Sequence, residues 1–290
     1  MGPDRDVRPV SWRSWRPDLS PICDMTEDQL VSEALQLVAA EDYAHALPLW
    51  EKARNTASET THKCIYLLHE ARCLRELKEF GLAEQRLQMA EKIDREKKLQ
   101  LDLEHARVRQ LYDLERYKDA NDRSKRLLNE HAQALAHPER AELRYEIKLG
   151  LGYGLVSGGE FEEGVKVLSE ILRVAENEDK RRIHYFCGLA LHHLKRDDNA
   201  VREFKKVLES GEQDQLSADA HYDLAMIYKS REEFTAAKQH LQKAEGLQDE
   251  LTVPLRYLYT ALAQVCNARG EMEETKKYIR LAESLPKMKQ

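Results

Sequence analysis

Seven segments of this chain carry small side chains at a nearly constant spacing. One series recurs at steps of 37, 37, 44, 36, 37 and 38 residues and comprises Ala46, Ala83, Ala120, Gly164, Ala200, Ala237 and Thr275. A second series lies twelve residues earlier and comprises Ala34, Ala71, Val108, Gly152, Gly188, Ala225 and Ala263. A period between about 20 and 50 residues indicates a linear array, in which each unit packs only against its neighbours.

The copy from His221 to Ala244 shows most clearly what one unit contains. Apolar side chains recur there at spacings of three and four, at Leu224, Ala225 and Tyr228 and then at Phe234, Ala237, Leu241 and Ala244. These spacings predict two short amphipathic helices rather than strands. Because isolated helices of this length are marginal in water, each helix pair must pack on the next. We therefore expect an all-α fold of stacked helix pairs.

A large side chain also lies three residues before the small residue of each second helix, at Tyr43, Phe80, Tyr117, Phe161, Phe234 and Met272, with Asp197 in its place in the fifth copy. Together with the two small residues, this pattern resembles the tetratricopeptide repeat. The resemblance covers residues 26–286 and implies a right-handed α-solenoid of about seven helix-turn-helix units, whose first helices line a concave groove. The units are expected near residues 27–63, 64–100, 101–144, 145–180, 181–217, 218–255 and 256–290. The chain departs from the family pattern in its period, which exceeds the usual value of about 34 residues, and at Ser124 and Asp197.

Residues 1–25 differ in composition from the repeats. The first 24 contain four of the eight prolines, four arginines and the pair Trp12 and Trp15, and they show no helical period. We expect a flexible tail, in which the tryptophans are either a short anchoring motif or part of an unstructured segment. The solenoid itself is expected over residues 26–290.

Half of the twelve glycines lie between residues 150 and 164, where the repeat spacing also lengthens. Glycine inside a helix costs roughly 1 kcal/mol relative to alanine, so these residues need a structural reason. Two interpretations are open: a hinge at 150–164 between three units and four, or close packing of helices. A phosphate-binding loop is not expected, because Gly150, Gly152 and Gly154 lie within a helical pattern rather than between a strand and a helix.

Composition argues against several classes of function. A net charge of -6, from 46 basic and 52 acidic residues, gives no general attraction to nucleic acid. The five cysteines lack the CxxC spacing of zinc or redox sites, and no apolar run approaches the length of about 18 residues that a membrane span requires. We expect a cytoplasmic protein in a reducing environment, without a membrane span and without a cofactor.

Neither a metal site nor a catalytic site is predicted. The adjacent His192 and His193 point about 100° apart on a helix, so they would chelate a metal poorly even with His184 two turns earlier. Acidic pairs such as Glu162 and Glu163 open second helices, where carboxylates stabilise the positive end of the helix dipole. We therefore expect no enzyme activity.

The family resemblance places the candidate binding residues on the groove side of the first helices. This side is rich in aromatic and arginine side chains, which are typical of protein interfaces. The candidates are Arg72, Arg75, Arg109, Tyr112, Tyr153, Tyr185, Phe186, His192, Tyr222, Met226, Lys229, Tyr257, Gln264 and Asn267, with Asp102, His105 and Asp223 in the same stripe. The arginines would suit an acidic or carboxylate-bearing segment, and the aromatic residues would suit an extended or helical apolar peptide.

The expected function is a non-catalytic scaffold or adaptor that binds a protein or peptide in this groove. Two alternatives are open. The chain could be a peptide-sensing regulatory protein, similar to bacterial repeat proteins with long units, or a structural solenoid that self-assembles through its exposed ends.

Overall fold

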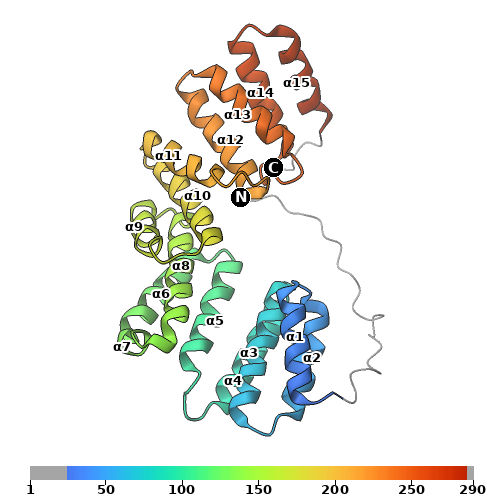
Figure 1. Cartoon of the computed structure of the whole chain (residues 1–290), viewed down its shortest axis with the longest axis vertical. Coiled ribbons are helices and arrows are strands. Elements are labelled where there is room, and N and C mark those ends of the chain that lie inside the picture. The colour runs from blue at the N-terminus through green and yellow to red at the C-terminus, as the bar shows by residue number, and fades with distance from the viewer. Residues whose placement is uncertain (1–24, 286–290) are drawn as a thin grey trace. The chain divides into compact units, whose positions relative to one another are not determined.

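The structure is a computed structural model that describes residues 25–285, and these residues form helices joined by turns and short loops (Figure 1). The helices come in seven pairs: α1 (Glu27–Ala39) and α2 (Tyr43–Thr56), α3 (Thr60–Glu76) and α4 (Phe80–Ile93), α5 (Gln100–Asp113) and α6 (Tyr117–Glu130), α8 (Ala141–Ser157) and α9 (Phe161–Ile171), α10 (Asn177–His193) and α11 (Asp197–Leu208), α12 (Gln215–Ser230) and α13 (Phe234–Gly246), and α14 (Leu255–Ala268) and α15 (Met272–Ser284). The short α7 (Ala132–Leu135) and the 3-10 helix η2 (Pro138–Arg140) follow the third pair. No strand occurs within the described range, which confirms the predicted all-α helical-repeat solenoid.

Contacts divide the chain into two compact halves between Gly150 and Leu151, inside α8. This division falls at the start of segment 150–164, and the hinge itself stays a prediction. The predicted tail with Trp12 and Trp15 lies outside the described residues, except for Met25 at its end.

The turns within the seven pairs share one backbone geometry. Each contains a residue with positive φ, between 56° and 86°, at Glu41, Lys78, Glu115, Gly159, Lys195, Glu232 and Gly270. The next amide donates to a carbonyl five residues earlier, as from Asp42 N to Leu37 O at 2.8 Å. In this Schellman arrangement a left-handed residue ends the first helix and satisfies its last free carbonyls. Its recurrence in every pair supports the count of seven repeats.

The small residues of the two series let paired helices approach closely. Several of them have no exposed surface: Ala34, Ala46, Ala83, Ala120, Ala200, Ala225 and Ala237. At the glycines the approach is closer, because a Cβ on Gly152 would lie 2.5 Å from Leu168 Cδ2 and one on Gly164 would lie 2.7 Å from Val156 Cγ2. Close packing therefore accounts for two of the glycines in segment 150–164.

Gly188 gives a test of this packing. A Cβ there would lie 2.8 to 3.0 Å from ring atoms of the fully buried Phe204, which cannot bend away. We expect Gly188→Ala to lower the free energy of unfolding by about 1–3 kcal/mol, measured by urea denaturation. Gly246→Ala is the control, because no atom lies within 4 Å of its added Cβ. Equal effects of the two substitutions would contradict the packing explanation.

The structure also explains where the repeat pattern fails. Ser124 replaces an apolar residue on α6, and its Oγ lies 3.1 Å from the hydroxyl of Tyr112, which also donates to Asn121. Asp197 replaces the large residue at the start of α11, and its Oδ1 lies 2.8 Å from His192 Nδ1. The step of 44 residues accommodates α7 and η2. Each departure thus has a local polar contact or an inserted turn as its cause.

Candidate functional site

Aromatic side chains from consecutive first helices meet in the C-terminal half. The ring centroid of Tyr153 on α8 is 4.5 Å from that of Phe186 on α10, and Phe186 meets Tyr185 edge to face at 5.9 Å. The Tyr185 hydroxyl reaches α12, where it donates to Asp223 Oδ2 at 3.2 Å. All four side chains are half-buried. We call Tyr153, Phe186 and Tyr185 the aromatic row.

Further candidate residues lie on α12 and α14. Tyr222 and Met226 pack partly against the core of the last two helix pairs, whereas Tyr257 is 50% exposed. Lys229 Nζ on α12 donates to Gln264 Oε1 on α14 at 2.8 Å. Neighbouring first helices thus contact each other through these candidate side chains.

Two carboxyl groups lie beside the aromatic row. Burial raises the pKa of Asp223 to about 7; the hydrogen bond from Tyr185 acts in the opposite direction, and Asp219 raises the pKa further. Asp219, one turn earlier on α12, is buried and accepts hydrogen bonds from Thr252 N at 3.0 Å and from Thr252 Oγ1 at 2.9 Å. Burial also raises the pKa of Asp219, although the bonds from Thr252 oppose this effect. Both groups are therefore held in surroundings that disfavour a negative charge.

A cavity of about 1290 Å³ adjoins the aromatic row in the C-terminal half. Tyr185, Phe186, Asp219 and Thr252 line one part of it. Charged side chains line the rest, including Lys180, Arg182, Lys206, Glu209, Glu212 and Glu250. The cavity therefore combines ring surfaces with charges of both signs.

Buried Arg181 fixes one wall of this cavity. Its guanidinium donates to both carboxylate oxygens of Asp214 at 2.9 Å, to Ser217 Oγ at 3.2 Å and to Val207 O at 3.3 Å. These bonds hold α10 against the end of α11 and the start of α12. Of the three consecutive basic residues Lys180, Arg181 and Arg182, the central one thus has a structural role.

A smaller cavity, of about 500 Å³, lies in the N-terminal half and contains the three arginines predicted for the groove. Arg75 is buried, with Nε 2.7 Å from Asp113 Oδ2 and Nη2 2.6 Å from Glu76 Oε1. Arg72 and Arg109 are exposed and form no ion pair within residues 25–285. These two guanidinium groups are the ones available to an anionic ligand.

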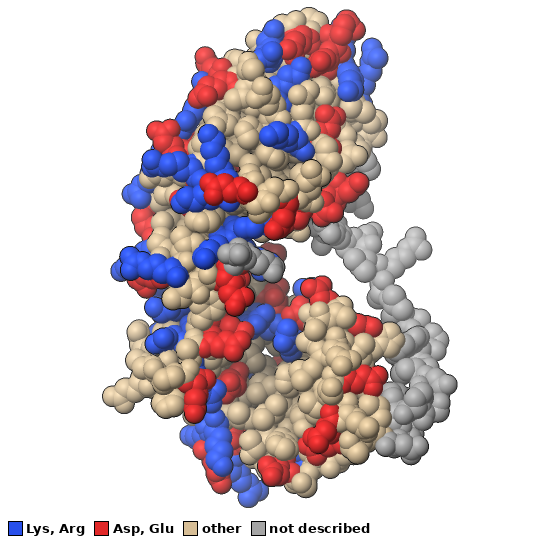
Figure 2. Space-filling model, in the orientation of Figure 1, with Lys and Arg blue, Asp and Glu red and all other residues tan. Residues whose placement is uncertain are grey.

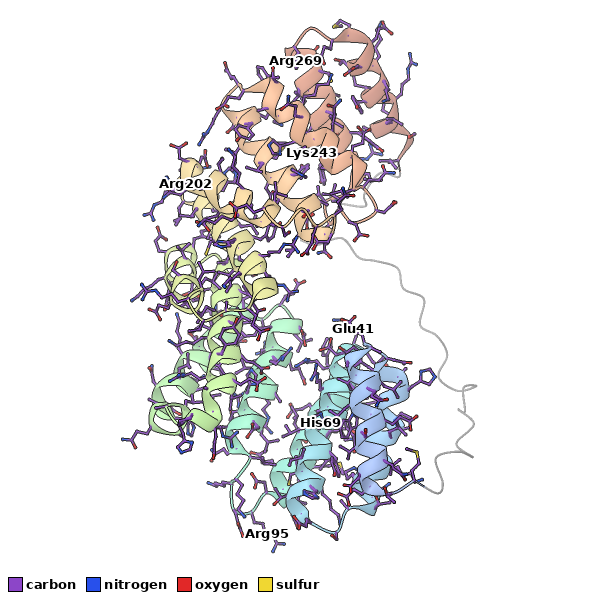
Figure 3. All side chains as sticks on the ribbon, viewed as in Figure 1. Glu41, His69, Arg95, Arg202, Lys243 and Arg269 are labelled. Atoms are coloured by element: carbon purple, nitrogen blue, oxygen red, sulfur yellow. The ribbon has the colours of Figure 1, made fainter. Side chains whose placement is uncertain are left out.

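The two histidines of this smaller cavity are neutral near pH 7. His69, labelled on α3 in Figure 3, stacks on Trp50 with ring centroids 4.2 Å apart. Burial, assisted by the charge of Arg72, lowers the pKa of His69 to about 4. Burial and the charges of Arg109 and Arg75 likewise lower the pKa of His105 to about 4. The histidines therefore add ring surface and no positive charge.

Some of the predicted groove residues belong neither to the aromatic row nor to the smaller cavity. Tyr112 directs its hydroxyl to α6, and His192 contacts Asp197 in the turn to α11, so both contribute to the packing of their own helix pairs. Asn267 is exposed on α14. Sequence reasoning missed Asp219, although its position four residues before Asp223 on one helix places the two on the same face.

One group of side chains in the described range has the spacing to hold a metal ion: Cys266, Glu271 and Glu274. Lys238 Nζ lies 2.7 Å from Glu271 Oε2 and also contacts the Glu274 carboxylate. An ammonium group thus already neutralises the two carboxylates. The group is an ion-pair network that joins α13 to α15.

Two further features are the distribution of charge on the surface and the length of the apolar stretches in the helices. On the face shown in Figure 2, acidic and basic side chains are interspersed over each half. Among the helices of residues 25–285, none has an apolar stretch long enough to span a bilayer.

Comparison with known proteins supports the repeat assignment. A family model described as tetratricopeptide repeat matches residues 218–250, which contain most of α12 and all of α13. No curated protein sequence matches the chain.

Solved structures with the same fold are distant in sequence. A tetratricopeptide repeat protein from Parabacteroides merdae is 16% identical, with a TM-score of 0.56 over 91% of this chain and 94% of that one. The apo form of RapI is 16% identical, with a TM-score of 0.71 over 88% of this chain and 75% of that one. A Rap protein in complex with competence and sporulation factor is 13% identical, with a TM-score of 0.59 over 89% and 76%. At these identities the likeness concerns the fold alone.

Proposed function

We propose that this chain, which is a tetratricopeptide-repeat protein, is a non-catalytic scaffold or adaptor that binds a protein or peptide segment along its first helices. The observation that carries the proposal is the aromatic row, which runs from α8 to α10 and reaches α12 through Tyr185. A partner that follows the row would contact several repeats at once. Binding spread over several repeats is how solenoid proteins use their extended surfaces.

The chemistry of the row suits a protein partner. Tyr185 and Phe186 line the larger cavity, and the rings are only half-buried, so they retain surface that a partner could cover. Aromatic rings provide large contact areas at a small cost in conformational entropy, and they are common among residues that dominate binding energy. One structural relative, a Rap protein, is known in complex with competence and sporulation factor, so a fold of this kind can carry a bound partner.

A peptide display selection tests the proposal. Peptides selected from a random library on the intact chain should bind the variant Phe186→Ala/Tyr222→Ala at least about 30-fold more weakly, because dominant interface residues each contribute about 2 kcal/mol or more. The measurement is a titration of labelled peptide by fluorescence anisotropy. Circular dichroism and urea denaturation would confirm that the variant is folded.

Arg202→Ala is the matched control. Arg202 is exposed on α11, which is the second helix of its pair, and is labelled in Figure 3. This variant should bind the selected peptides as the intact chain does. Peptides that bind the folded double variant without loss, or a selection that yields no binder, would argue against the surface formed by the aromatic row and Tyr222 as the binding site.

A further inference from the structure

Asp219 and Asp223 form an unusual pair on α12. They are four residues apart, so they lie on the same face of the helix, where two negative charges repel each other. Asp219 is 4% exposed, and Asp223 lies half-buried beside Tyr185. Neither residue caps the helix, because the N-cap of α12 is Asp214. Asp219 holds the loop before α14 through its bonds from Thr252, but this contact does not account for the repulsion between the two carboxylates.

The side chains that donate hydrogen bonds to these carboxylates bring no positive charge. From α10, Tyr185 donates a hydrogen bond to Asp223; from the loop before α14, Thr252 donates to Asp219. On α12 the neighbouring titratable group is Tyr222, and on α14 it is Tyr257, which acts on Tyr222. Within residues 25–285 neither carboxylate has a Lys, Arg or His partner.

Other buried charges in the same chain are paired. Glu70 lies between Arg54 and Arg86, with distances of 2.5 and 2.6 Å, and Arg181 is bonded to Asp214. A buried charge without a counter-ion costs several kcal/mol, of which a correctly placed counter-ion restores a large part. The two aspartates on α12 are thus prepared for a cation that the described part of the chain does not provide.

We propose that the groove of the C-terminal half binds a basic side chain, Lys or Arg, of the partner segment, with Asp223 and Asp219 as counter-ions and the neighbouring aromatic rings as its walls. This inference rests on the proposed function, whose partner segment would supply the side chain. Tyr185, Phe186 and Tyr222 offer ring faces, and a cation over such a ring gains about 0.5–2 kcal/mol, more when water is excluded. The long alkyl stem of a Lys or Arg side chain would pack along the apolar rings of the aromatic row.

A basic side chain fits this place better than a metal ion. The oxygen ligands available are two carboxylates, and Asp219 already accepts both donors of Thr252, whereas hard cations need about six oxygens. The basic residues of the larger cavity are Lys180, Arg181 and Arg182 near the start of α10 and Lys206 in the last turn of α11, and Arg181 is already bonded to Asp214. The partner's cation would lie beside Tyr185 and Asp219, which line the cavity, and next to Asp223, which Tyr185 contacts.

The test is a double-mutant cycle on selected peptides. Peptides that require Phe186 and Tyr222 should share a Lys or Arg at a fixed position. Replacing that residue by norleucine should weaken binding to the intact chain at least about 10-fold, and should have little effect on binding to Asp223→Asn. Asp249→Asn, which changes an exposed carboxylate after α13, is the control and should behave as the intact chain does.

Ionisation of Asp223 gives an independent readout. Because the cation binds the carboxylate and not the neutral acid, affinity for the basic peptide should increase about 30-fold from about pH 5.5 to pH 8, given a pKa of about 7 in the free protein. The Asp223→Asn variant should lack this increase. The norleucine peptide should also bind independently of pH over this range.

The possible results separate this inference from the proposed function. Peptides that depend on Phe186 and Tyr222 but carry no preferred basic residue would overturn the cation site and leave the scaffold function intact. The same holds if acetylation of the peptide's N-terminal amine, rather than replacement of its side chain, removes binding. Peptides that ignore both aromatic residues, or a selection without binders, would overturn the proposed function and the cation site together.

Discussion

Asp223 should make the folded chain less stable by about 4 kcal/mol as the pH rises from about 4 to about 8, and Asp223→Asn should remove this loss. Burial raises the pKa of the carboxyl from 3.8 to about 7 in the folded state. The folded chain therefore holds a proton that the unfolded chain has released, so the stabilisation is complete below about pH 4 and is lost as the pH rises through about 7. One pKa unit corresponds to about 1.36 kcal/mol, which gives the stated magnitude.

The difference between the two proteins is the quantity to measure, because other groups titrate in the same range. Burial lowers the pKa of His221 and His240 to about 4, so these histidines destabilise the fold as the pH falls below about 6.5. Subtracting the urea unfolding curves of Asp223→Asn from those of the intact chain removes their contribution. If the free energy of unfolding of the intact chain minus that of Asp223→Asn does not change with pH, the Asp223 carboxyl is well solvated and the prediction is wrong. The control variant Asp249→Asn should have the same free energy of unfolding as the intact chain at every pH.

The repeat architecture could be predicted because its signals are local and occur seven times. Residues such as Ala225 and Ala237 lie twelve apart, which is the distance between facing positions of two helices joined by a tight turn. Their full burial matches the reason given for their size. A single degenerate copy would have been weak evidence for the fold. The same register recurs in all seven copies, including those with glycine at the small-residue positions and those that depart from the pattern at Ser124 and Asp197.

The turns between paired helices could not be predicted in the same detail. Five of the seven left-handed positions hold Lys or Glu rather than glycine, for example Lys78 and Glu232. These residues pay a steric cost for positive φ and give no sequence signal of it. The fold sets this conformation, because the hydrogen bond that ends each first helix requires it.

The candidate site was only partly accessible to sequence reasoning. Helical register placed Tyr153, Tyr185 and Phe186 on one side of the first helices, and the structure brings their rings together. Register gives the direction of a side chain but not its partner. Tyr112 shares the same register, yet its hydroxyl turns to Ser124 and Asn121, because those polar groups are buried and need a hydrogen bond. Whether Asp219 and Asp223 have counter-ions likewise depends on contacts between different helix pairs.

Glu70→Ala should destabilise the N-terminal half by about 3–5 kcal/mol. The Glu70 side chain is fully buried on α3, with Oε1 2.5 Å from Arg54 Nε of α2 and Oε2 2.6 Å from Arg86 Nε of α4. Arg54 and Arg86 are themselves about four-fifths buried. Removing the carboxylate leaves the largely desolvated guanidinium of Arg54 without its counter-ion and that of Arg86 with only the partly exposed Glu51, which accounts for the magnitude. Urea denaturation followed by circular dichroism would measure the loss.

A triple variant distinguishes two causes of this loss of stability: the missing attraction within the ion pairs, and the burial of charges that have no partner. In Arg54→Met/Glu70→Leu/Arg86→Met, three apolar side chains of similar volume replace the buried members of the cluster, and the one carboxylate that loses its partner, Glu51, is 40% exposed to solvent. We expect this variant to be within about 1–2 kcal/mol of the intact chain, since well-packed apolar residues often match a buried ion network in stability. If the triple variant were as unstable as Glu70→Ala, the ion pairs themselves would be holding α2, α3 and α4 together. The pair on α12 would then differ more clearly from this cluster, because Asp219 is buried and Asp223 half-buried without any such ion pairs.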